Sequence, residues 1–273
     1  MKTLENQTLL YDEDCPLCSV YTTSFIKSGM LDQNGRKPYC QLAPEDQSFV
    51  DIKRATNEIA LVDNKNKTVI YGIDSLLKVI GFSFPWMEKV GTTKPIHLFL
   101  KKLYSFISYN RKVIIPSKAK EENKLQCTPD FSYKYRLIYI GISIIITTFT
   151  LFNYSNLIPD VPKSSFSREF LVAFGQIIFQ IIFLLKLDKR TIINYVGNLM
   201  TVSFLGSIML MPMLVLNQLI NLPITLVLIW FRITVLIMFK EHLRRIKILN
   251  LPFYLCFTWG LYRIIALLLI LNL

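Results

Sequence analysis

Cysteine and histidine are scarce in this chain of 273 residues, which has five cysteines and two histidines. An odd number of cysteines at irregular spacing excludes a small scaffold held together by disulfides. Beyond residue 127 the chain has one cysteine, Cys256, and one histidine, His242, which falls in a predicted loop. That half therefore lacks the paired cysteines of a transmembrane dithiol relay and the ligands of a haem site, although a bound quinone stays open as an electron carrier.

Two further absences concern targeting and charge. Residues 1–30 lack the basic-then-apolar pattern of a cleavable signal peptide. Acidic residues are rare after Arg136, where the chain has 4 Asp or Glu and 11 Lys or Arg. Residues 1–136 have 15 Asp or Glu and 20 Lys or Arg. The net charge of +12 does not indicate a nucleic-acid partner. Much of the excess falls in loops between apolar runs, and no nucleic-acid-binding module is recognisable.

Long apolar runs dominate the second half, and each is close to the roughly 20 residues that cross a bilayer as a helix. We predict about five spans, with four or six left open by Pro212 and Pro223: 137–157, 169–187, 192–216, 219–239 and 251–272. Loops rich in Lys and Arg alternate with loops that have few net positive charges. Because Lys and Arg are in excess in cytoplasmic loops, this alternation predicts a cytosolic N-terminus and an external C-terminus. The expected location is the inner (cytoplasmic) membrane of a bacterium, with the N-terminal domain in the cytosol.

Two arginines fall inside predicted spans. A charged side chain within the bilayer is costly unless it faces a partner, a cavity or a lipid headgroup. Arg232 and Arg263 are therefore candidate intramembrane functional residues, and snorkelling of Arg263 toward the membrane surface is the alternative. Glutamine and asparagine within spans more often join neighbouring helices.

The most informative motif is Cys15-Pro16-Leu17-Cys18. An apolar segment, Thr8–Tyr11, and an acidic turn, Asp12–Asp14, precede it, and a segment with helical periodicity follows it. Two cysteines three residues apart at the start of a helix can close a small disulfide ring, and the helix N-terminus favours the thiolate. We predict Cys15 as the nucleophile and Cys18 as the resolving thiol of a disulfide exchange. A zinc half-site and an inert pair are the alternatives, but zinc needs about four ligands and no second close pair is present.

The acidic residues before the motif have two interpretations. A carboxylate near the resolving cysteine can accept a proton during exchange, and we predict this catalytic role for Asp12. The alternative is that Asp12 and Asp14 stabilise the turn and cap the helix, which we favour for Asp14. Nearby carboxylates also raise the pKa of a thiol, which opposes the effect of the helix N-terminus.

Residues 1–115 show the order of elements that is typical of a thioredoxin-like α/β domain. Strands at 8–11 and 38–42 flank a helix at 18–30, and a short helix within 43–55 leads to a hairpin of 58–62 and 68–71 and then to a helix that begins at 75. Residues 95–109 form an amphipathic helix, either part of the domain core or an interfacial helix leading to the membrane. A basic, polar stretch that begins at Asn110 is typical of a linker, which we place at 116–136, before an all-α transmembrane helical domain at 137–273.

The stretch from Tyr11 to Cys18 resembles the signature of the DCC family of predicted thiol–disulfide oxidoreductases. Asp12, Cys15 and Cys18 match the Asp-x-x-Cys-x-x-Cys pattern of that family. Three further stretches are similar to it: Glu58–Val62, Val69–Leu77 and Tyr104–Arg111. The resemblance covers about residues 6–115 and implies a thioredoxin-like fold with a dithiol site. Typical thioredoxins place a cis-proline just before the third strand, where this chain has Thr56-Asn57-Glu58.

The leading hypothesis is therefore a membrane-anchored thiol–disulfide oxidoreductase without cofactor or metal. Its expected partners are the lipid bilayer and a disulfide or dithiol substrate, either a protein or a small molecule. The alternative is a membrane binding or transport protein whose thioredoxin-like domain serves regulation or docking. We expect Cys40 to be a buried, inert thiol, Cys127 a bystander, and His97 a structural rather than a catalytic residue.

Overall fold

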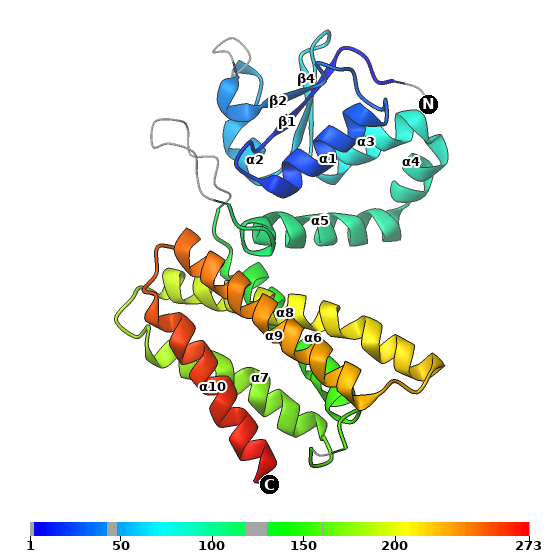
Figure 1. Cartoon of the computed structure of the whole chain (residues 1–273). Coiled ribbons are helices and arrows are strands. Elements are labelled where there is room, and N and C mark those ends of the chain that lie inside the picture. The colour runs from blue at the N-terminus through cyan, green and yellow to red at the C-terminus, as the bar shows by residue number, and fades with distance from the viewer. Residues whose placement is uncertain (1–2, 43–47, 118–129, 160, 273) are drawn as a thin grey trace. The chain divides into compact units, whose positions relative to one another are not determined.

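The computed structural model describes residues 3–42, 48–117, 130–159 and 161–272. The chain forms two compact units, Met1–Tyr135 and Arg136–Leu273 (Figure 1). The division falls in the first turn of helix α6 (Tyr133–Ser155), close to the beginning of the predicted transmembrane domain. Cys127 and most of the predicted linker lie outside the described residues.

The N-terminal unit is built on a mixed sheet that has four strands in the described part of the chain. They are β1 (Gln7–Tyr11), β2 (Arg36–Pro38), β3 (Ala60–Asp63) and β4 (Thr68–Tyr71), in the spatial order β2-β1-β3-β4. β1 runs parallel to β2, with Leu9 opposite Arg36, and antiparallel to β3, with Leu9 opposite Leu61. A parallel pair needs a crossover connection, which helix α1 (Pro16–Lys27) supplies.

Successive residues of β1 and β3 point to opposite faces of the sheet. Leu9 and Leu61 pack in a core with residues of α1, α3 (Ile73–Ser83) and α5 (Lys94–Ile114). Leu10 and Val62 lie on the other face, in a core with residues of η1 (Tyr39–Gln41) and α2 (Ile52–Asn57). Both faces are covered, which explains why these two strands are short continuous apolar runs.

Three predicted elements differ from the observed ones. The second strand ends at Pro38 because proline has no N–H to continue the ladder, and Cys40 lies half-buried in the η1 turn that follows. The described part of the predicted short helix is α2, which begins only at Ile52. The helix predicted at 95–109 continues to Ile114, so Asn110 and Arg111 are buried helical residues and not linker residues.

The predicted β3–β4 hairpin is confirmed. Asp63 Oδ1 accepts hydrogen bonds from the backbone N–H groups of Lys65 and Asn66, at 3.0 and 2.9 Å. Lys67 then adopts a left-handed conformation, with φ of 53°, before β4 begins. The side chain of Asp63 thus replaces the backbone partners that the turn cannot supply.

The C-terminal unit consists of five helices in the described residues: α6, α7 (Phe166–Ile182), α8 (Lys189–Leu219), α9 (Ile224–Ile248) and α10 (Tyr254–Leu271). Each overlaps one predicted span. Three of them, α6, α8 and α10, are long and apolar enough to cross a membrane. By contrast, α7 has 17 residues, and α9 carries Arg232 and a charged last third, Lys240–Lys247. The sequence of this unit is thus that of a membrane protein with three clear candidate spans.

The prediction that His242 lies in a loop is wrong. It lies within α9 and is buried, because α9 continues well past the predicted end of the span at 239. Arg245, one turn further on, donates from its guanidinium to Glu241 at 2.8 Å and to Asn198 of α8 at 2.9 Å. Charged residues that we assigned to a loop are therefore partners inside the helical unit, and these contacts keep the last turns of α9 ordered against α8.

Candidate active site

The two cysteines of the motif lie together at the start of α1. Cys15 is the N-cap residue, Pro16 occupies the first helical position, and the backbone N–H of Cys18 points at Cys15 Sγ over 3.4 Å. Proline suits this position because its missing N–H would have no helical partner there. Both sulfurs are free thiols, and the residues are 0% and 4% exposed.

A tight turn positions the dithiol, and Asp12 builds it. The backbone N–H of Asp14 donates to Asp12 Oδ1 at 3.0 Å, and the backbone N–H of Cys15 donates to the Asp12 carbonyl oxygen at 3.2 Å. The hydroxyl of Ser117 also donates to the Asp14 carbonyl oxygen. The alternative role that we weighed for both aspartates, turn formation, therefore has a direct structural basis for Asp12.

The second oxygen of Asp12 forms a buried ion pair with Arg111 of α5. The Arg111 guanidinium lies 3.0 Å from Asp12 Oδ2 and also donates to the Thr56 carbonyl oxygen at 2.9 Å. Lys112 Nζ lies 3.6 Å from the same carboxylate oxygen. Both Asp12 and Arg111 are buried. Arg111 thus joins the turn before the dithiol to the segment before β3.

Two tyrosines complete the surroundings of the dithiol. The hydroxyl of Tyr104, on α5, accepts a hydrogen bond from the backbone N–H of Ile59 at 2.8 Å. The hydroxyl of Tyr21, one turn after Cys18 on α1, helps to lower the pKa of Cys18. Burial raises the pKa of both tyrosines, so both keep their protons at neutral pH.

The electrostatics of the pair favour one negative charge and one retained proton. The pKa of Cys18 falls from 9.0 to about 7, first because the Cys15 thiol donates a hydrogen bond to it and then because of Arg111 and Tyr21, against the effect of burial. The same hydrogen bond and burial raise the pKa of Cys15. Burial alone would lower the pKa of Arg111, but Cys18 and Asp12 together raise it. The thiol that ionises near neutral pH is therefore Cys18, and not Cys15 as the helix N-terminus alone would favour. Arg111 is a permanent positive charge close to this pair.

We expect the alkylation rate of the dithiol by a small neutral reagent such as iodoacetamide to rise with pH around a midpoint near 7. The thiolate is the reactive form, and the pKa of Cys18 is about 7. The same thiol in the denatured chain should titrate near 9.0. Because the folded-state pKa is the lower one, ionisation adds stability as the pH rises from about 7 to 9 and loses it as the pH falls through 7. A midpoint near 9 in the folded protein would contradict this electrostatic account.

Of the residues predicted for the site, Cys15, Cys18 and Asp12 are brought together. Cys40 is half-buried, with its thiol 3.9 Å from the Glu13 carboxylate. His97 pairs with Asp74 at 2.6 Å on the surface, between α5 and α3, which suits a structural role.

The two intramembrane candidates belong to the helical unit. Arg232 is exposed on α9. Arg263 is half-buried, and its guanidinium stacks over the Trp259 ring, 4.0 Å from the ring centroid.

Sequence reasoning missed Arg111, Tyr104 and Tyr21 as site residues. The signal for the first two was present, because Tyr104–Arg111 is one of the stretches that resemble the DCC family. Tyr104, Ser108 and Arg111 are spaced by four and three residues, which places them on one face of a helix. That face is turned inward, and the Ser108 hydroxyl donates to the Asn57 carbonyl oxygen.

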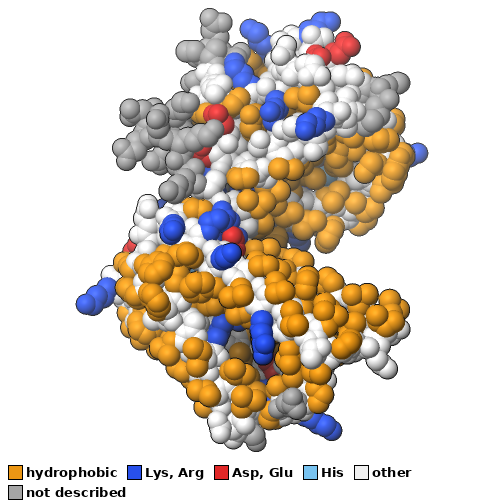
Figure 2. Space-filling model, in the orientation of Figure 1, with side chains coloured by type: hydrophobic (Ala, Val, Ile, Leu, Met, Phe, Trp, Pro, Cys, Tyr) orange, Lys and Arg blue, Asp and Glu red, His pale blue; other side chains and the backbone are white. Residues whose placement is uncertain are grey.

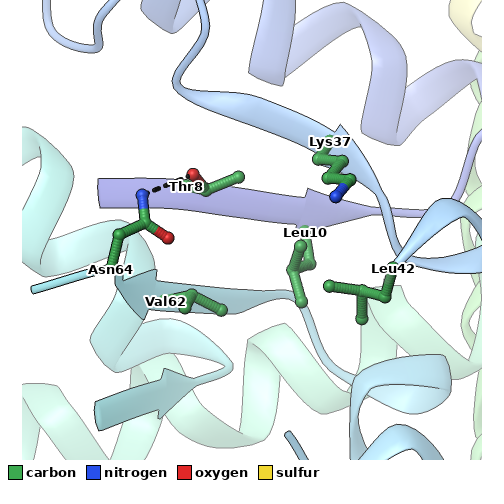
Figure 3. Close-up of a pocket in the computed structure, with 6 residues that line it drawn as sticks. All are labelled: Thr8, Leu10, Lys37, Leu42, Val62 and Asn64. Atoms are coloured by element: carbon green, nitrogen blue, oxygen red, sulfur yellow. Dashed lines mark hydrogen bonds between the residues drawn. The ribbon is translucent and has the colours of Figure 1, made fainter. Parts of the chain in front are cut away.

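A small pocket of about 70 Å³ lies on the sheet face that carries Leu10 and Val62 (Figure 3). Its other lining residues are Thr8, Lys37, Leu42 and Asn64. Asn64 Nδ2 donates to Thr8 Oγ1 at 3.0 Å across one end of it. The pocket has room for a few water molecules at most, and none of its lining residues is a cysteine, so we do not place the chemistry there.

Within the described ranges, no three His, Cys, Asp or Glu side chains gather in a way that could hold a metal ion. The chain has no match among protein-family models, curated proteins or solved structures. The arrangement of its own residues is therefore the basis for assigning a function.

Proposed function

We propose that this chain is a membrane-anchored thiol–disulfide oxidoreductase whose N-terminal unit is a thioredoxin-like domain of the DCC family. The observation that carries the proposal is the Cys15–Cys18 dithiol at the start of α1, with a pKa near 7 for Cys18. A structural pair of buried thiols has no need of a neighbouring cation, whereas a redox pair needs a thiolate.

The architecture supports the thioredoxin-like assignment. A parallel β1-α1-β2 unit followed by the antiparallel β3-β4 hairpin and α3 is the plan that the DCC resemblance implies. The dithiol lies where β1 gives way to α1, at the carboxyl end of the strand. Before β3, where typical thioredoxins have a cis-proline, this chain has Thr56. The carbonyl oxygen of Thr56 accepts a hydrogen bond from Arg111. We therefore propose that Arg111, and not a proline, shapes the surface that meets the substrate.

The proposed exchange is a two-electron transfer in two steps. Cys15 attacks one sulfur of the substrate disulfide, its proton passes to Cys18, and the other substrate sulfur leaves as a thiolate. Cys18 then loses its proton to solvent and attacks Cys15 Sγ. This step closes the Cys15–Cys18 disulfide, releases the second substrate sulfur and leaves the substrate reduced. The reverse sequence oxidises a substrate dithiol, and an external thiol or disulfide resets the pair.

In this scheme Asp12 is a positioning residue. Its Oδ1 is occupied by the Asp14 N–H and its Oδ2 by Arg111 and Lys112. Both carboxylate oxygens are thus already engaged by neighbouring groups. We propose that Asp12 instead fixes the Arg111 guanidinium beside the thiolate, which replaces the proton-acceptor role expected from the sequence.

The helical unit supplies the membrane anchor. We propose that all five helices cross the bilayer, with the N-terminal unit in the cytosol and the C-terminus outside, in the inner membrane of a bacterium. The positions of the basic residues support this topology: Lys186, Lys189 and Arg190 lie between α7 and α8 or at the start of α8, and Lys240–Lys247 lies at the end of α9. Arg232 and Arg263 stay candidate functional residues of the membrane part.

A redox titration of the full-length protein in membranes tests the proposal. Samples equilibrated over a series of glutathione ratios are alkylated with a mass tag and analysed by mass spectrometry. We expect one transition in which Cys15 and Cys18 lose two tags together, with the slope of a two-electron couple. Persistence of both thiols under oxidising conditions, or a disulfide from either one to Cys40, would contradict the proposal.

A second candidate function is a membrane binding or transport protein, and a polar cluster inside the helical unit favours it. The Tyr195 hydroxyl lies 3.2 Å from His242 Nε2 and donates to Gln180 Oε1 at 3.0 Å, and Thr258 donates to the same oxygen at 3.1 Å. Among the described residues, His242 Nδ1 and Gln180 Nε2 are buried without a hydrogen-bond partner. Such groups inside an apolar bundle suit a small polar ligand or water.

A further inference from the structure

Helices α4 (Pro85–Gly91) and α5 carry a large exposed apolar surface on the N-terminal unit. Seven side chains form what we call the α4–α5 face: Trp86, Met87 and Val90 of α4, and Ile96, Phe99, Leu103 and Ile107 of α5. Trp86 and Phe99 are 65% and 63% exposed. In Figure 2, hydrophobic side chains gather over the part of the molecule that these two helices occupy in Figure 1.

The face is continuous along α5. Ile96, Phe99, Leu103 and Ile107 follow one another at intervals of three and four residues, which aligns them along one side of the helix. The adjoining side of α5 is already occupied, because Tyr104 bonds to Ile59 and Arg111 pairs with Asp12 inside the domain. α5 is thus a two-sided helix whose outer apolar side stays exposed among the described residues of the N-terminal unit.

The charges around the face are predominantly positive. Residues 85–114 contain Lys89, Lys94, Lys101, Lys102, Arg111 and Lys112 and a single acidic residue, Glu88. The first four lysines are exposed. An amphipathic helix with a basic polar side and aromatic residues on its apolar side has the composition of a helix that lies in the interfacial layer of a membrane.

The position of α5 in the chain places it close to a bilayer. The helix ends at Ile114 and the candidate span α6 begins at Tyr133, which leaves residues 115–132 between them. A tether of that length reaches at most about 60 Å, so the face cannot move far from the membrane. Anionic headgroups complement the lysines, whereas a second copy of this basic surface would repel it.

We infer that the α4–α5 face docks onto the bilayer, with its apolar side chains in the interfacial layer and its lysines among anionic lipid headgroups. This docking does not depend on the proposed redox chemistry. It has a geometric consequence for the dithiol, since Arg111 of α5 pairs with Asp12, three residues before Cys15. Docking therefore holds the dithiol near the surface of the bilayer.

Photo-crosslinking of the full-length protein in lipid vesicles tests the inference. A benzophenone amino acid replaces Phe99 in one variant and Val20 in the other. Val20 is a matched control because it is 62% exposed on helix α1, away from the α4–α5 face. In vesicles of phosphatidylcholine with phosphatidylglycerol, we expect phospholipid adducts at position 99 in at least about tenfold excess over position 20.

The other outcomes overturn the inference. An adduct from position 99 to a peptide of the helical unit would mean that the chain itself covers the face, and an adduct to a second copy would mean a dimer. Absence of any lipid adduct at position 99 would also overturn the inference. The electrostatic part has its own measurement: Lys101→Gln with Lys102→Gln should weaken docking by about 30-fold. Equal adduct yields with and without the anionic lipid would overturn that part.

Discussion

Replacing Arg111 by methionine is expected to destabilise the N-terminal unit by about 3–5 kcal/mol, the usual cost of removing one partner from a buried ion pair. The loss leaves the Asp12 carboxylate buried, with Lys112 at 3.6 Å as the cation that still faces it. It also leaves the Thr56 carbonyl oxygen without the donor that lies 2.9 Å away. Arg111 joins the turn after β1 to the segment before β3, so its loss weakens the packing of α5 as well.

Hydrogen exchange of the full-length protein in nanodiscs measures this effect. Amides of β1 and β3 should exchange more than about 100-fold faster in Arg111→Met, since 1.4 kcal/mol corresponds to a factor of ten. Lys112→Met is the matched control, because Lys112 faces the same carboxylate but its side chain is 23% exposed. It should change the free energy of unfolding by less than about 1 kcal/mol. Equal effects of the two variants would contradict the assignment of Arg111 as the structural partner.

A double variant separates the ion pair from the rest of the site. Asp12→Asn keeps an oxygen for the Asp14 N–H and removes the charge that Arg111 neutralises. In Asp12→Asn with Arg111→Met, no uncompensated charge stays buried. The double variant should therefore be less destabilised than the sum of the two single variants by about 0.5–3 kcal/mol. Strict additivity would mean that the two side chains do not interact.

The same variant has a chemical signature that a purely structural role would not produce. Arg111 lowers the pKa of Cys18 by its positive charge. In Arg111→Met, the midpoint of thiol alkylation should move upward from about 7 toward 9.0. Arg111→Lys keeps the charge, so it should move the midpoint less, although a lysine cannot bridge Asp12 and Thr56 as the planar guanidinium does.

The largest effect on activity is expected from the dithiol itself. Cys15→Ser and Cys18→Ser should each abolish the catalytic exchange of a disulfide substrate, because neither variant can close the Cys15–Cys18 disulfide. Cys18→Ser should in addition accumulate a mixed disulfide with the substrate at Cys15, since the resolving thiol is missing. The measurement is substrate reduction with a regenerating thiol, followed by mass spectrometry of the protein without reductant.

Cys40→Ser is the control for these two variants. Its thiol is half-buried and lies 3.9 Å from a carboxylate of Glu13, so its loss should leave the exchange unchanged. If Cys15→Ser changes neither disulfide exchange in the assay nor the function of the protein in cells, the oxidoreductase proposal fails. The binding or transport function, with the polar cluster around Tyr195 and His242, then becomes the better candidate.

Much of the N-terminal fold was predictable because its signals are local. The β3–β4 hairpin follows from two apolar runs and the polar turn between them. The start of α1 follows from Pro16, although the N-cap is Cys15 and not Asp14, the residue that we favoured. The extent of α5 was not predictable in the same way, because Asn110, Arg111 and Lys112 begin a polar, basic stretch in the sequence and are helical in the structure, where they have tertiary partners. Asn110, for example, donates to the Tyr135 carbonyl oxygen at 3.1 Å.

The membrane half shows the same division. Five apolar runs predicted five helices, and the length and composition of α6, α8 and α10 are those of membrane spans. The polar interior of this unit was not predictable, since Tyr195 and Gln180 meet His242 only when three helices pack. A buried polar group must find a partner from whichever element lies beside it, and sequence spacing does not identify that element.

The sequence by itself determined that this chain has a dithiol at the start of a helix, an α/β unit that contains it, and an apolar helical unit that follows in the chain. Spacing, turn residues and the length of apolar runs are enough for these features, because each depends on residues close together in the chain. Only the tertiary structure decided the electrostatics of the dithiol. Arg111 reaches Asp12 across 99 positions of sequence, and a charge acts through distance in space, which a linear pattern does not contain.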